Sequence, residues 1–449
     1  MGKLFGTDGV RGVANLELTP ELAFKIGRAV GEVLTNKDKG VVVVGKDTRA
    51  SGDMLEAALT AGLTSIGLSV MQLGIIPTPA VAYLTRKYSA VAGVVISASH
   101  NPGEYNGIKI FNSKGLKLAD AIEEKIESII LNDEEISERP IKEHIGRVYI
   151  NENGKRDYIE FLKGTINTDL SGMKIAMDCG NGALFEIGPI LLQELGADVE
   201  TINITPDGMN INKACGSTKP ELVQQLVIEI GADLGVAFDG DADRIIAVDE
   251  TGKIINGDHI LAICGRHLKG KGKLYKDKVV GTVMTNIGLD IFLKENGLGI
   301  EKTAVGDRYI LEKMIEEGYT LGGEQSGHII FLEHNTTGDG MATALQILEI
   351  MKETKSKASD LNSIMSDYPQ VLVNARVDNR YKTRFMEVPE IKAEVLKLEE
   401  MFHGKGRVLI RPSGTEPLVR VMIEGKDQEW INQKAIELAN FIESKIGIK

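Results

Sequence analysis

The sequence repeats one pattern of strands and helices three times, and this repetition limits the fold more than any other feature. Each repeat has an apolar strand, a helix, a second strand, a second helix, and a third strand that runs into a polar loop. The first strands are expected at Val41–Gly45, Lys174–Asp178 and Val279–Met284, and the helices after them at Met54–Ile66, Leu184–Leu195 and Leu289–Asn296. Gly67, Gly196 and Gly297 stand where glycines commonly end helices. Apolar, β-branched strands that alternate with helices are typical of buried, largely parallel sheets, so the pattern predicts three α/β domains.

The last part of the chain follows a different pattern. From about Val371 it reads as a strand, a helix at Ile391–Phe402, a pair of strands around Arg411–Thr415, and a closing helix. Charged stretches at Asn132–Arg147 and Lys352–Tyr368 are expected to be connectors. We therefore predict three similar α/β domains, at residues 1–150, 151–253 and 254–368, followed by a smaller α+β domain at residues 369–449.

The charge balance and the cysteine content exclude several classes of protein. There are 52 Lys and Arg residues against 64 Asp and Glu residues, a formal net charge of −12, so we expect no nucleic-acid partner and no anionic membrane partner. The three cysteines are widely spaced and form no C-x-x-C pair, which is typical of a reducing compartment. The chain begins without an apolar leader pattern and has no run of 18 apolar residues. We expect a cytoplasmic protein.

Three polar loops follow the closing strands of the three repeats. They are Ser97–Pro102, Asp239–Arg244 and Gly323–His328. Ligands of open α/β sheets bind beyond the carboxyl ends of the strands. The three loops are therefore expected to converge on one central cleft. Because the chain as a whole is acidic, an anionic ligand there would need locally basic residues.

The aspartate loop, residues 239–244, predicts a metal site. Asp239, Asp241 and Asp243 follow the apolar strand Leu234–Phe238 at alternate positions. Crowded carboxylates repel one another unless a cation neutralises them, and oxygen ligands of this kind favour Mg²⁺. A solvated acidic turn remains an alternative, and so does a phosphatase whose nucleophile is Asp239. An EF-hand is excluded because Arg244 stands at the sixth position, where that loop needs glycine.

Ser99 is the candidate nucleophile. It follows apolar residues 94–96, and its neighbours Ser97 and Ala98 are small, so its hydroxyl can be presented without steric hindrance. Serine is a weak nucleophile by itself, and His100 and Lys109 are candidates for proton transfer or charge neutralisation. A Ser-His-Asn-Pro turn that caps a helix is the alternative. The serine does not lie in a G-x-S-x-G motif, which argues against an acyl hydrolase.

The C-terminal domain contains a loop that suits a phosphate group. Arg411 supplies a forked cation, Ser413 and Thr415 supply hydroxyls, and Gly414 lets backbone N–H groups approach a ligand. A tight hairpin with an ordinary surface arginine is the alternative.

The loop that closes the third repeat offers groups that suit a sugar with many hydroxyls. Glu324 supplies a carboxylate, Ser326 a hydroxyl and His328 an imidazole. Glycine-rich loops with mixed polar residues are common, so this loop alone favours no single function. Arg11 and Arg244 are further candidates for an anionic ligand, although single arginines are more often surface or salt-bridge residues.

Taken in order, these motifs resemble the α-D-phosphohexomutase family along essentially the whole chain. The matching motifs are Gly6–Gly12, Ser97–Pro102, Asp239–Arg244, Gly323–His328 and Arg411–Pro417. Gln325 and the segment Val305–Arg308 are similar to the bacterial branch of the family that acts on glucosamine phosphates, while glucose and mannose phosphates stay open as substrates. Ala242 is a departure, because many members of the family have glycine there.

The resemblance implies four domains around a central cleft, of which the first three share one mixed-sheet α/β topology. It implies an isomerase that carries a phosphoserine at Ser99 and passes through glucosamine 1,6-bisphosphate to form a precursor of amino-sugar nucleotides and the cell wall. It also implies that the Ser99 phosphate and Asp239, Asp241 and Asp243 hold Mg²⁺. The expected partner is a small phosphosugar, and a homodimer is left open. A sugar-phosphate sensor that keeps the cleft without turnover is the non-enzymatic alternative.

The resemblance also assigns the remaining site residues. It favours Lys109 and His328 for proton transfer, keeps His100 as a further candidate, and places Arg11 at the catalytic centre. The substrate-binding residues that it implies are Glu324, Ser326, Arg244, Arg411, Ser413, Gly414, Thr415 and Arg420.

Overall fold

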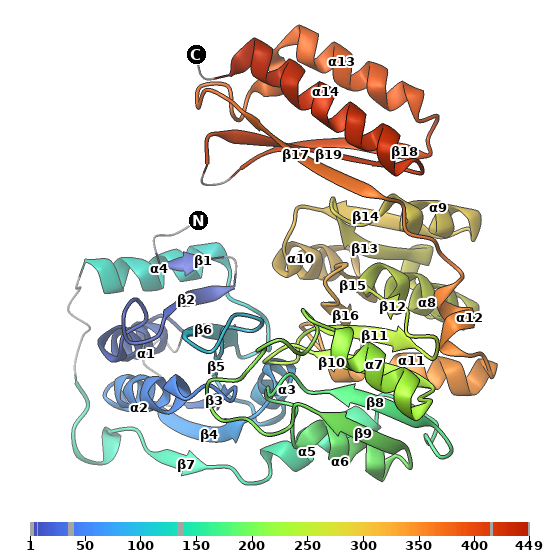
Figure 1. The fold of residues 1–449 in the computed structure, drawn as a ribbon. Helices are drawn as coiled ribbons and strands as arrows, with labels where there is room; N and C mark the ends of the chain where they lie inside the picture. Colours follow the sequence, from blue (N-terminus) through green and yellow to red (C-terminus); the bar gives the residue numbers. More distant parts are fainter. Residues whose placement is uncertain (1–3, 7, 35–39, 133–138, 414–415, 448–449) are drawn as a thin grey trace. The chain divides into compact units, whose positions relative to one another are not determined.

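The computed structural model describes residues 4–6, 8–34, 40–132, 139–413 and 416–447 (Figure 1). These residues form two compact units. The first unit comprises Met1–Met284 and Ile300–Ser363, and the second comprises Thr285–Gly299 and Ile364–Lys449. Each unit is described by itself.

The first sheet of the larger unit is mixed and has the order β1-β2-β6-β5-β3-β4-β7. Its strands are β1 (Phe5–Gly6), β2 (Gly9–Val13), β3 (Val41–Lys46), β4 (Ser69–Ile75), β5 (Ala92–Ile96), β6 (Tyr105–Asn112) and β7 (Val148–Ile150). Strand β3 runs parallel to β4 and β5, and β6 runs antiparallel to β5. The associated helices are α1 (Pro20–Leu34), α2 (Ser51–Thr64), α3 (Thr78–Lys87) and α4 (Asp120–Leu131). Apolar side chains of α1, α2 and α4 pack with those of β3, β5 and β6 in one core.

The second sheet has five strands in the order β12-β11-β10-β8-β9. The strands are β8 (Lys174–Asp178), β9 (Asp198–Ile202), β10 (Leu234–Phe238), β11 (Ile245–Asp249) and β12 (Ile254–Ile255). Its helices are α5 (Gly154–Lys163), α6 (Ile187–Glu194) and α7 (Glu221–Ile230). Strand β10 is parallel to β8 and antiparallel to β11, so this sheet repeats the arrangement of β3, β5 and β6 in the first sheet.

The third sheet has four strands in the order β14-β13-β15-β16. The strands are β13 (Lys278–Thr282), β14 (Gly299–Thr303), β15 (Leu321–Gly323) and β16 (Ile329–Phe331). Its helices are α8 (Gly257–Gly270), α10 (Asp307–Glu317), α11 (Gly340–Thr354) and α12 (Ala358–Asn362). Strand β15 is again parallel to one neighbour, β13, and antiparallel to the other, β16.

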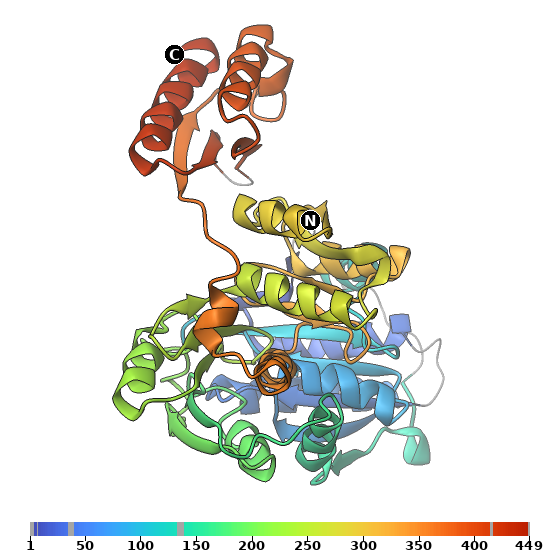
Figure 2. The same ribbon diagram turned by 90° about the vertical axis from the view of Figure 1, so that its right-hand side faces the viewer.

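The smaller unit is built on a three-stranded antiparallel sheet. Its strands are β17 (Gln370–Arg376), β18 (Gly406–Pro412) and β19 (Leu418–Gly425), in the order β17-β19-β18. Helices α13 (Pro389–Met401) and α14 (Gln428–Ile446) lie on one face of the sheet (Figures 1 and 2). Apolar side chains such as Val395, Ile431 and Leu438 pack against Val419 and Val421 in one core. Helix α9 (Ile287–Glu295) also belongs to this unit.

The predicted fold class is confirmed, with three mixed-sheet α/β domains and a smaller C-terminal α+β domain. The predicted strands Lys174–Asp178 and Leu234–Phe238 have the observed bounds of β8 and β10. The predicted connector at Lys352–Tyr368 is wrong in part, because it contains the end of α11 and all of α12. Its charged residues lie on helices that bury their apolar side, and charge alone does not distinguish such helices from a loop.

Two further features of the chain are the state of its cysteines and the character of its helices. The three cysteines are free and buried, as small apolar side chains would be. Among the described residues, no helix combines the length and the apolar character that crossing a membrane requires.

Candidate active site

The serine loop, residues 97–102, connects β5 to β6 at the end of a buried strand. Ser99 has left-handed backbone geometry, with φ of 52°, and its side chain is buried. Its Oγ donates a hydrogen bond to Asp239 Oδ2 at 2.6 Å and lies 3.4 Å from His100 Nδ1. The alternative of a turn that caps a helix is wrong, because the next element is strand β6. The hydroxyl therefore faces the aspartate loop rather than open solvent.

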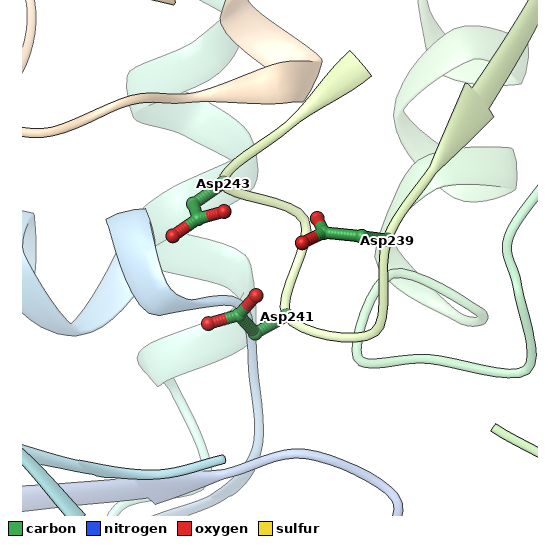
Figure 3. Close-up of side chains that lie close together, drawn as sticks. All are labelled: Asp239, Asp241 and Asp243. Carbon is green, nitrogen blue, oxygen red and sulfur yellow. The ribbon is translucent and has the colours of Figure 1, made fainter. Parts of the chain in front are cut away.

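The aspartate loop connects β10 to β11, and its three carboxylates point toward one another (Figure 3). Asp239, Asp241 and Asp243 are buried, and each offers one oxygen within 4.8 Å of the others. Thr78, at the start of α3, donates from its hydroxyl to Asp241 Oδ2 at 2.5 Å. Strand β11 begins at Ile245, directly after the loop. The loop thus joins two strands, which also agrees with the exclusion of an EF-hand.

A buried lysine from β6 supplies the positive charge nearest to these carboxylates. Lys109 Nζ lies 2.8 Å from Asp241 Oδ2, 3.3 Å from Asp243 Oδ2 and 2.9 Å from Asp8 Oδ2. Burial alone would lower the pKa of Lys109, but the carboxylates of Asp241, Asp8 and Asp243 raise it well above the usual range. The lysine is therefore positively charged.

The carboxylates differ in how strongly they favour the charged form. Burial, together with repulsion from Asp243 and Asp241, raises the pKa of Asp239 well above its usual range. Burial opposes the ionisation of Asp243 too, but Lys109 and His328 hold its pKa well below the usual range. Asp239 is thus the carboxylate that gains most from an added cation.

The donor set of this loop fits a divalent metal ion. Asp241 Oδ1 and Asp243 Oδ1 are buried and accept no hydrogen bond from any described residue. Buried polar atoms are normally satisfied, so such oxygens call for a further partner. Carboxylate oxygens are the ligands that Mg²⁺ prefers in proteins. The buried aspartate triad is therefore compatible with a Mg²⁺ site.

A cavity of about 440 Å³ lies beside this centre within the larger unit. It is lined by residues from all three α/β domains, including Arg11, His100, Arg244, Asp307, Glu324 and His328. Ser99 and Ser326 are not among the described residues that line it. Four predicted cationic or imidazole residues, Arg11, His100, Arg244 and His328, thus line the same cavity as the carboxylate of Glu324.

Two arginines supply positive charge to this cavity. Arg11 forms an ion pair with Asp8, and Arg244 Nη1 lies 3.2 Å from His100 Nδ1. The Nε atoms of both arginines are buried and donate no hydrogen bond within the described residues. Burial, Arg244 and Arg11 lower the pKa of His100, which favours its neutral form. The cavity therefore holds unused guanidinium donors that suit a phosphate group.

The sugar loop, residues 323–328, joins β15 to β16. Gly327 has φ of 90°, and a Cβ atom there would lie 1.8 Å from the carbonyl oxygen of Ile245, so glycine is required at this position. Glu324 is half-buried and accepts a hydrogen bond from the backbone N–H of Gly306 at 3.2 Å. Ser326 is exposed. The loop thus presents Glu324 and His328 to the cavity, and Ser326 to solvent.

Sequence reasoning missed a chain of charged groups that joins the first and third domains. Lys117 Nζ lies 2.5 Å from both Asp8 Oδ1 and Asp307 Oδ2. His328 Nε2 lies 3.4 Å from Asp307 Oδ2, and its Nδ1 lies 3.7 Å from Asp243 Oδ1. Burial lowers the pKa of His328, but Asp243 and Asp307 raise it overall. Asp8 and Asp307 lie inside quoted motifs, whereas no local signal marked Lys117.

The predicted phosphate loop lies in the smaller unit, at the end of the β18–β19 hairpin. Arg411 and Arg420 stand directly opposite each other in the antiparallel register. Partial burial and the neighbouring Arg420 lower the pKa of Arg411. Ser413 is buried and accepts a hydrogen bond from the backbone N–H of Glu416 at 3.3 Å. Two paired cations suit a dianion. The predicted residues Gly414 and Thr415 lie outside the described residues.

Comparison with protein families matches nearly the whole chain. Models of phosphoglucomutase/phosphomannomutase alpha/beta/alpha domains I, II and III match residues 2–137, 156–252 and 256–368. The model of the C-terminal domain of the same family matches residues 372–441.

Similar proteins cover the full length as well. Phosphoglucosamine mutases of Acetivibrio thermocellus and Clostridioides difficile are 60% and 58% identical to the chain, and each alignment covers 100% of both sequences. Among solved structures, a phosphoglucomutase/phosphomannomutase family protein of Burkholderia thailandensis has a TM-score of 0.82 at 23% identity, covering 98% of each chain. Aspergillus fumigatus N-acetylphosphoglucosamine mutase in complex with GlcNAc-6P and magnesium has a TM-score of 0.66 at 18% identity, covering 98% of this chain and 96% of its own. These two structures share the fold.

Proposed function

The chain belongs to the phosphoglucomutase/phosphomannomutase family of phosphohexomutase isomerases, and from this premise we propose that it interconverts glucosamine 6-phosphate and glucosamine 1-phosphate. The sugar is proposed because full-length relatives at 57–60% identity are phosphoglucosamine mutases. The product would serve as a precursor of amino-sugar nucleotides and of the cell wall.

One observation carries the proposed reaction. Ser99 Oγ lies 2.6 Å from Asp239 Oδ2, at the edge of a buried triad of carboxylates. Ser99 thus lies against three acidic groups, and burial together with repulsion from Asp243 and Asp241 raises the pKa of the Asp239 carboxyl that accepts its hydrogen bond. The arrangement suits a phosphoserine whose charge and that of the triad are balanced by a shared cation. We propose that Ser99 carries the transferred phosphoryl group.

In the forward direction, the phosphoryl group leaves Ser99 for the C1 hydroxyl of glucosamine 6-phosphate. The P–O bond to Ser99 Oγ breaks, a P–O bond to the sugar C1 oxygen forms, and the hydroxyl proton passes to the protein. The product is glucosamine 1,6-bisphosphate. After this intermediate turns around in the site, its 6-phosphoryl group passes to Ser99 and leaves glucosamine 1-phosphate.

Asp239, Asp241 and Asp243 would hold Mg²⁺ together with the Ser99 phosphate. When bound, this ion offsets the charge that builds up on the transferring group. Lys109 stays charged beside Asp241 and Asp243 and adds a fixed positive charge next to the triad. Arg11 and Arg244 would bind phosphate oxygens through the Nε donors that are unused within the described residues.

Proton transfer needs a group that faces the cavity. His100 and His328 both line it. Burial, Arg244 and Arg11 lower the pKa of His100, whereas Asp243 and Asp307 raise the pKa of His328 against the effect of burial. His328 Nε2 accepts a hydrogen bond from the backbone N–H of Gly338 at 3.0 Å, which leaves Nδ1 as the atom that carries its proton. We propose His328 as the acid and His100 as an acceptor, with Lys109 as a fixed charge rather than a proton carrier. Glu324 would bind sugar hydroxyls, and Ser326 would join it only if the loop closes on the substrate. In the smaller unit, Arg411, Arg420 and Ser413 would hold the non-reacting phosphate.

Side-by-side kinetics test the substrate. The phosphorylated protein is assayed with Mg²⁺ and a catalytic amount of hexose 1,6-bisphosphate on glucosamine, glucose and mannose 6-phosphates. We expect the highest kcat/KM for glucosamine 6-phosphate. A higher kcat/KM for either neutral sugar would contradict the proposed substrate, and the absence of multiple turnover on all three would favour a sugar-phosphate sensor.

The site of phosphorylation separates the mutase from a phosphatase that uses Asp239. Phosphoserine survives acid and hydroxylamine, whereas an aspartyl phosphate does not. Mass spectrometry after each treatment is expected to find the phosphate on Ser99, and Ser99→Ala is expected to carry none. A phosphate that hydroxylamine removes and that persists in Ser99→Ala would place the nucleophile at Asp239.

A further inference from the structure

A buried arginine that sequence reasoning did not single out holds the serine loop. Arg49 lies just after β3, and its side chain is fully buried together with that of Asp47. Its Nε donates to Asp47 Oδ2 at 2.9 Å. Its four remaining N–H groups donate to backbone carbonyls, with distances of 3.0 Å to Ser99, 2.8 Å to Asn101 and 3.0 Å to Tyr105 in addition to a bond to Pro102.

This arrangement uses every donor that a guanidinium group has. All four carbonyls belong to the serine loop or to the first residue of β6, and none belongs to the strand that precedes the loop. An ordinary buried ion pair would satisfy its remaining donors with whatever groups lie nearby. Here all of these donors bind the serine loop or the residue at which β6 begins. The position of the loop is therefore tied to the position of the arginine side chain.

The same arginine closes a ring of hydrogen bonds around Ser99. The backbone N–H of Ser99 donates to Ser97 Oγ at 2.9 Å, and Ser97 Oγ donates to Asp47 Oδ2 at 2.5 Å. Asp47 accepts from Arg49, and Arg49 donates to the carbonyl of Ser99. Both backbone polar groups of Ser99 are therefore fixed by one connected set of Asp47, Arg49 and Ser97.

Ser99 needs such support because its φ of 52° lies in the left-handed region. A residue with a side chain is disfavoured in that region because its Cβ atom crowds the following carbonyl oxygen. The second domain adds a further support, since Asn212 Nδ2 donates to the carbonyls of Ser99 and Asn101 at 2.8 and 3.1 Å. The side chain of Ser99 takes no part in the ring, so it stays available for chemistry.

We propose that Arg49, with Asp47 and Ser97, forms a set of positioning residues that holds the Ser99 backbone in the orientation for phosphoryl transfer. The inference rests on the proposed role of Ser99. It assigns the three residues to the rate of the transfer step and not to substrate binding, because none of them lines the cavity among the described residues.

Two variants test this proposal, and they remove different numbers of the hydrogen bonds that hold the serine loop. Arg49→Lys keeps the charge but supplies three donors in place of five, and Ser97→Ala removes one link of the ring while leaving the ion pair. Arg86→Lys is the matched control, because Arg86 is a part-buried arginine of the same domain that donates to Asn335 Oδ1 at 2.8 Å and not to the serine loop. All three are compared with the wild-type protein by kcat, KM, phosphoserine content and thermal unfolding.

We expect Arg49→Lys to lower kcat per phosphorylated site by about 10- to 100-fold, since a misplacement of about 1 Å can cost this much. Ser97→Ala should lower it by about 10-fold. KM should stay within about twofold in both, because the cavity residues are untouched. Arg86→Lys should keep the wild-type kcat.

Other outcomes would overturn the proposal. If either variant keeps the wild-type kcat per phosphorylated site, or if kcat falls only in proportion to the folded fraction, the ring is merely structural. A rise in KM with unchanged kcat would place the residues in substrate binding. If Arg49→Lys does not fold, Ser97→Ala decides. Failure of the proposed function is distinguishable, because it would appear in the wild-type protein as the absence of turnover or of phosphate on Ser99.

Discussion

The serine loop and the aspartate loop occupy equivalent places in two domains but are held in different ways. Each follows a strand that is parallel to one neighbour, and each leads into an antiparallel strand. Each contains a residue other than glycine in left-handed geometry, with φ of 52° at Ser99 and 56° at Ala242. The serine loop is fixed through its backbone by Arg49. The aspartate loop also accepts backbone hydrogen bonds, from Thr78, Ala183 and Gly340, but its side chains are bonded as well, to Lys109 and Thr78.

The difference follows from what each loop has to offer. A nucleophile must keep its side chain free, so the neighbouring residues hold its backbone. A cluster of carboxylates must stay charged in a buried place, so the neighbouring residues supply a cation to the side chains themselves. The serine loop should therefore keep its structure when its side chain changes, and the aspartate loop should not.

The largest effect is expected from Ser99→Ala. Without the nucleophile, kcat should fall by about 10⁴-fold or more. Arg49, Ser97 and Asn212 bond only the backbone of this residue, and the substitution removes only one short hydrogen bond, from Oγ to Asp239 Oδ2, so the melting temperature should change by no more than about 2 °C. Kinetics and thermal unfolding of the same preparation measure both. A large loss of stability would show that the serine loop depends on its side chain after all.

The next largest effect is expected from Lys109→Met, which removes the cation of the aspartate loop. Asp8, Asp241 and Asp243 would then be buried without their shared partner, at a cost of about 3–5 kcal/mol in the free energy of unfolding. Added Mg²⁺ should restore part of this loss. Denaturant unfolding with and without Mg²⁺ measures the difference. If Lys109→Met were as stable as the wild-type protein in EDTA, the aspartate loop would not need the charge of Lys109.

A smaller effect of opposite sign is expected from Asp239→Asn in the metal-free protein. Burial, Asp243 and Asp241 raise the pKa of Asp239, so its charged form opposes folding. The contribution of this residue to stability is present at low pH and is lost as the pH rises through the raised pKa. The variant should therefore be more stable than wild type in EDTA by roughly 1–2 kcal/mol, and more so at pH 8 than at pH 5.

Mg²⁺ provides the control for that variant. The wild-type protein should gain stability when Mg²⁺ is added, whereas Asp239→Asn should gain much less, because one ligand of the proposed site has lost its charge. Thermal unfolding over a Mg²⁺ titration measures this. Equal stabilisation of both proteins would remove Asp239 from the metal site.

The smallest effect is expected from Ala242→Gly. Glycine adopts the left-handed geometry of this position without the penalty of a Cβ atom, although it also gains entropy in the unfolded chain. We expect a net stabilisation of about 0.5–1 kcal/mol. Ala237→Gly in strand β10 is the matched control and should destabilise. A loss of stability in Ala242→Gly would show that the methyl group has a packing role.

The sequence predicted those parts of the site that follow from local pattern. The repeat of strands and helices placed Ser99, Asp239 and Glu324 in loops at strand ends, and alternate aspartates indicated a cation. Ala242, a departure from the family pattern, has a φ of 56°, a geometry that glycine would adopt without the penalty of a Cβ atom. Ser326 is exposed and is not among the described residues that line the cavity, so its role in substrate binding stays a prediction. The orientation of a loop residue depends on the turn that carries it, which sequence spacing does not give.

By itself, the sequence determined the domain repeats, the strand ends and the residue types of each loop, because these follow from the local spacing of apolar, glycine and charged residues. Only the tertiary structure decided which distant side chains complete the site. Arg49 reaches loop carbonyls about 50 residues away, and Lys117 joins Asp8 to Asp307 across two domains. Such contacts depend on the packing of whole sheets and helices, and a buried charge leaves no periodic signal in the chain.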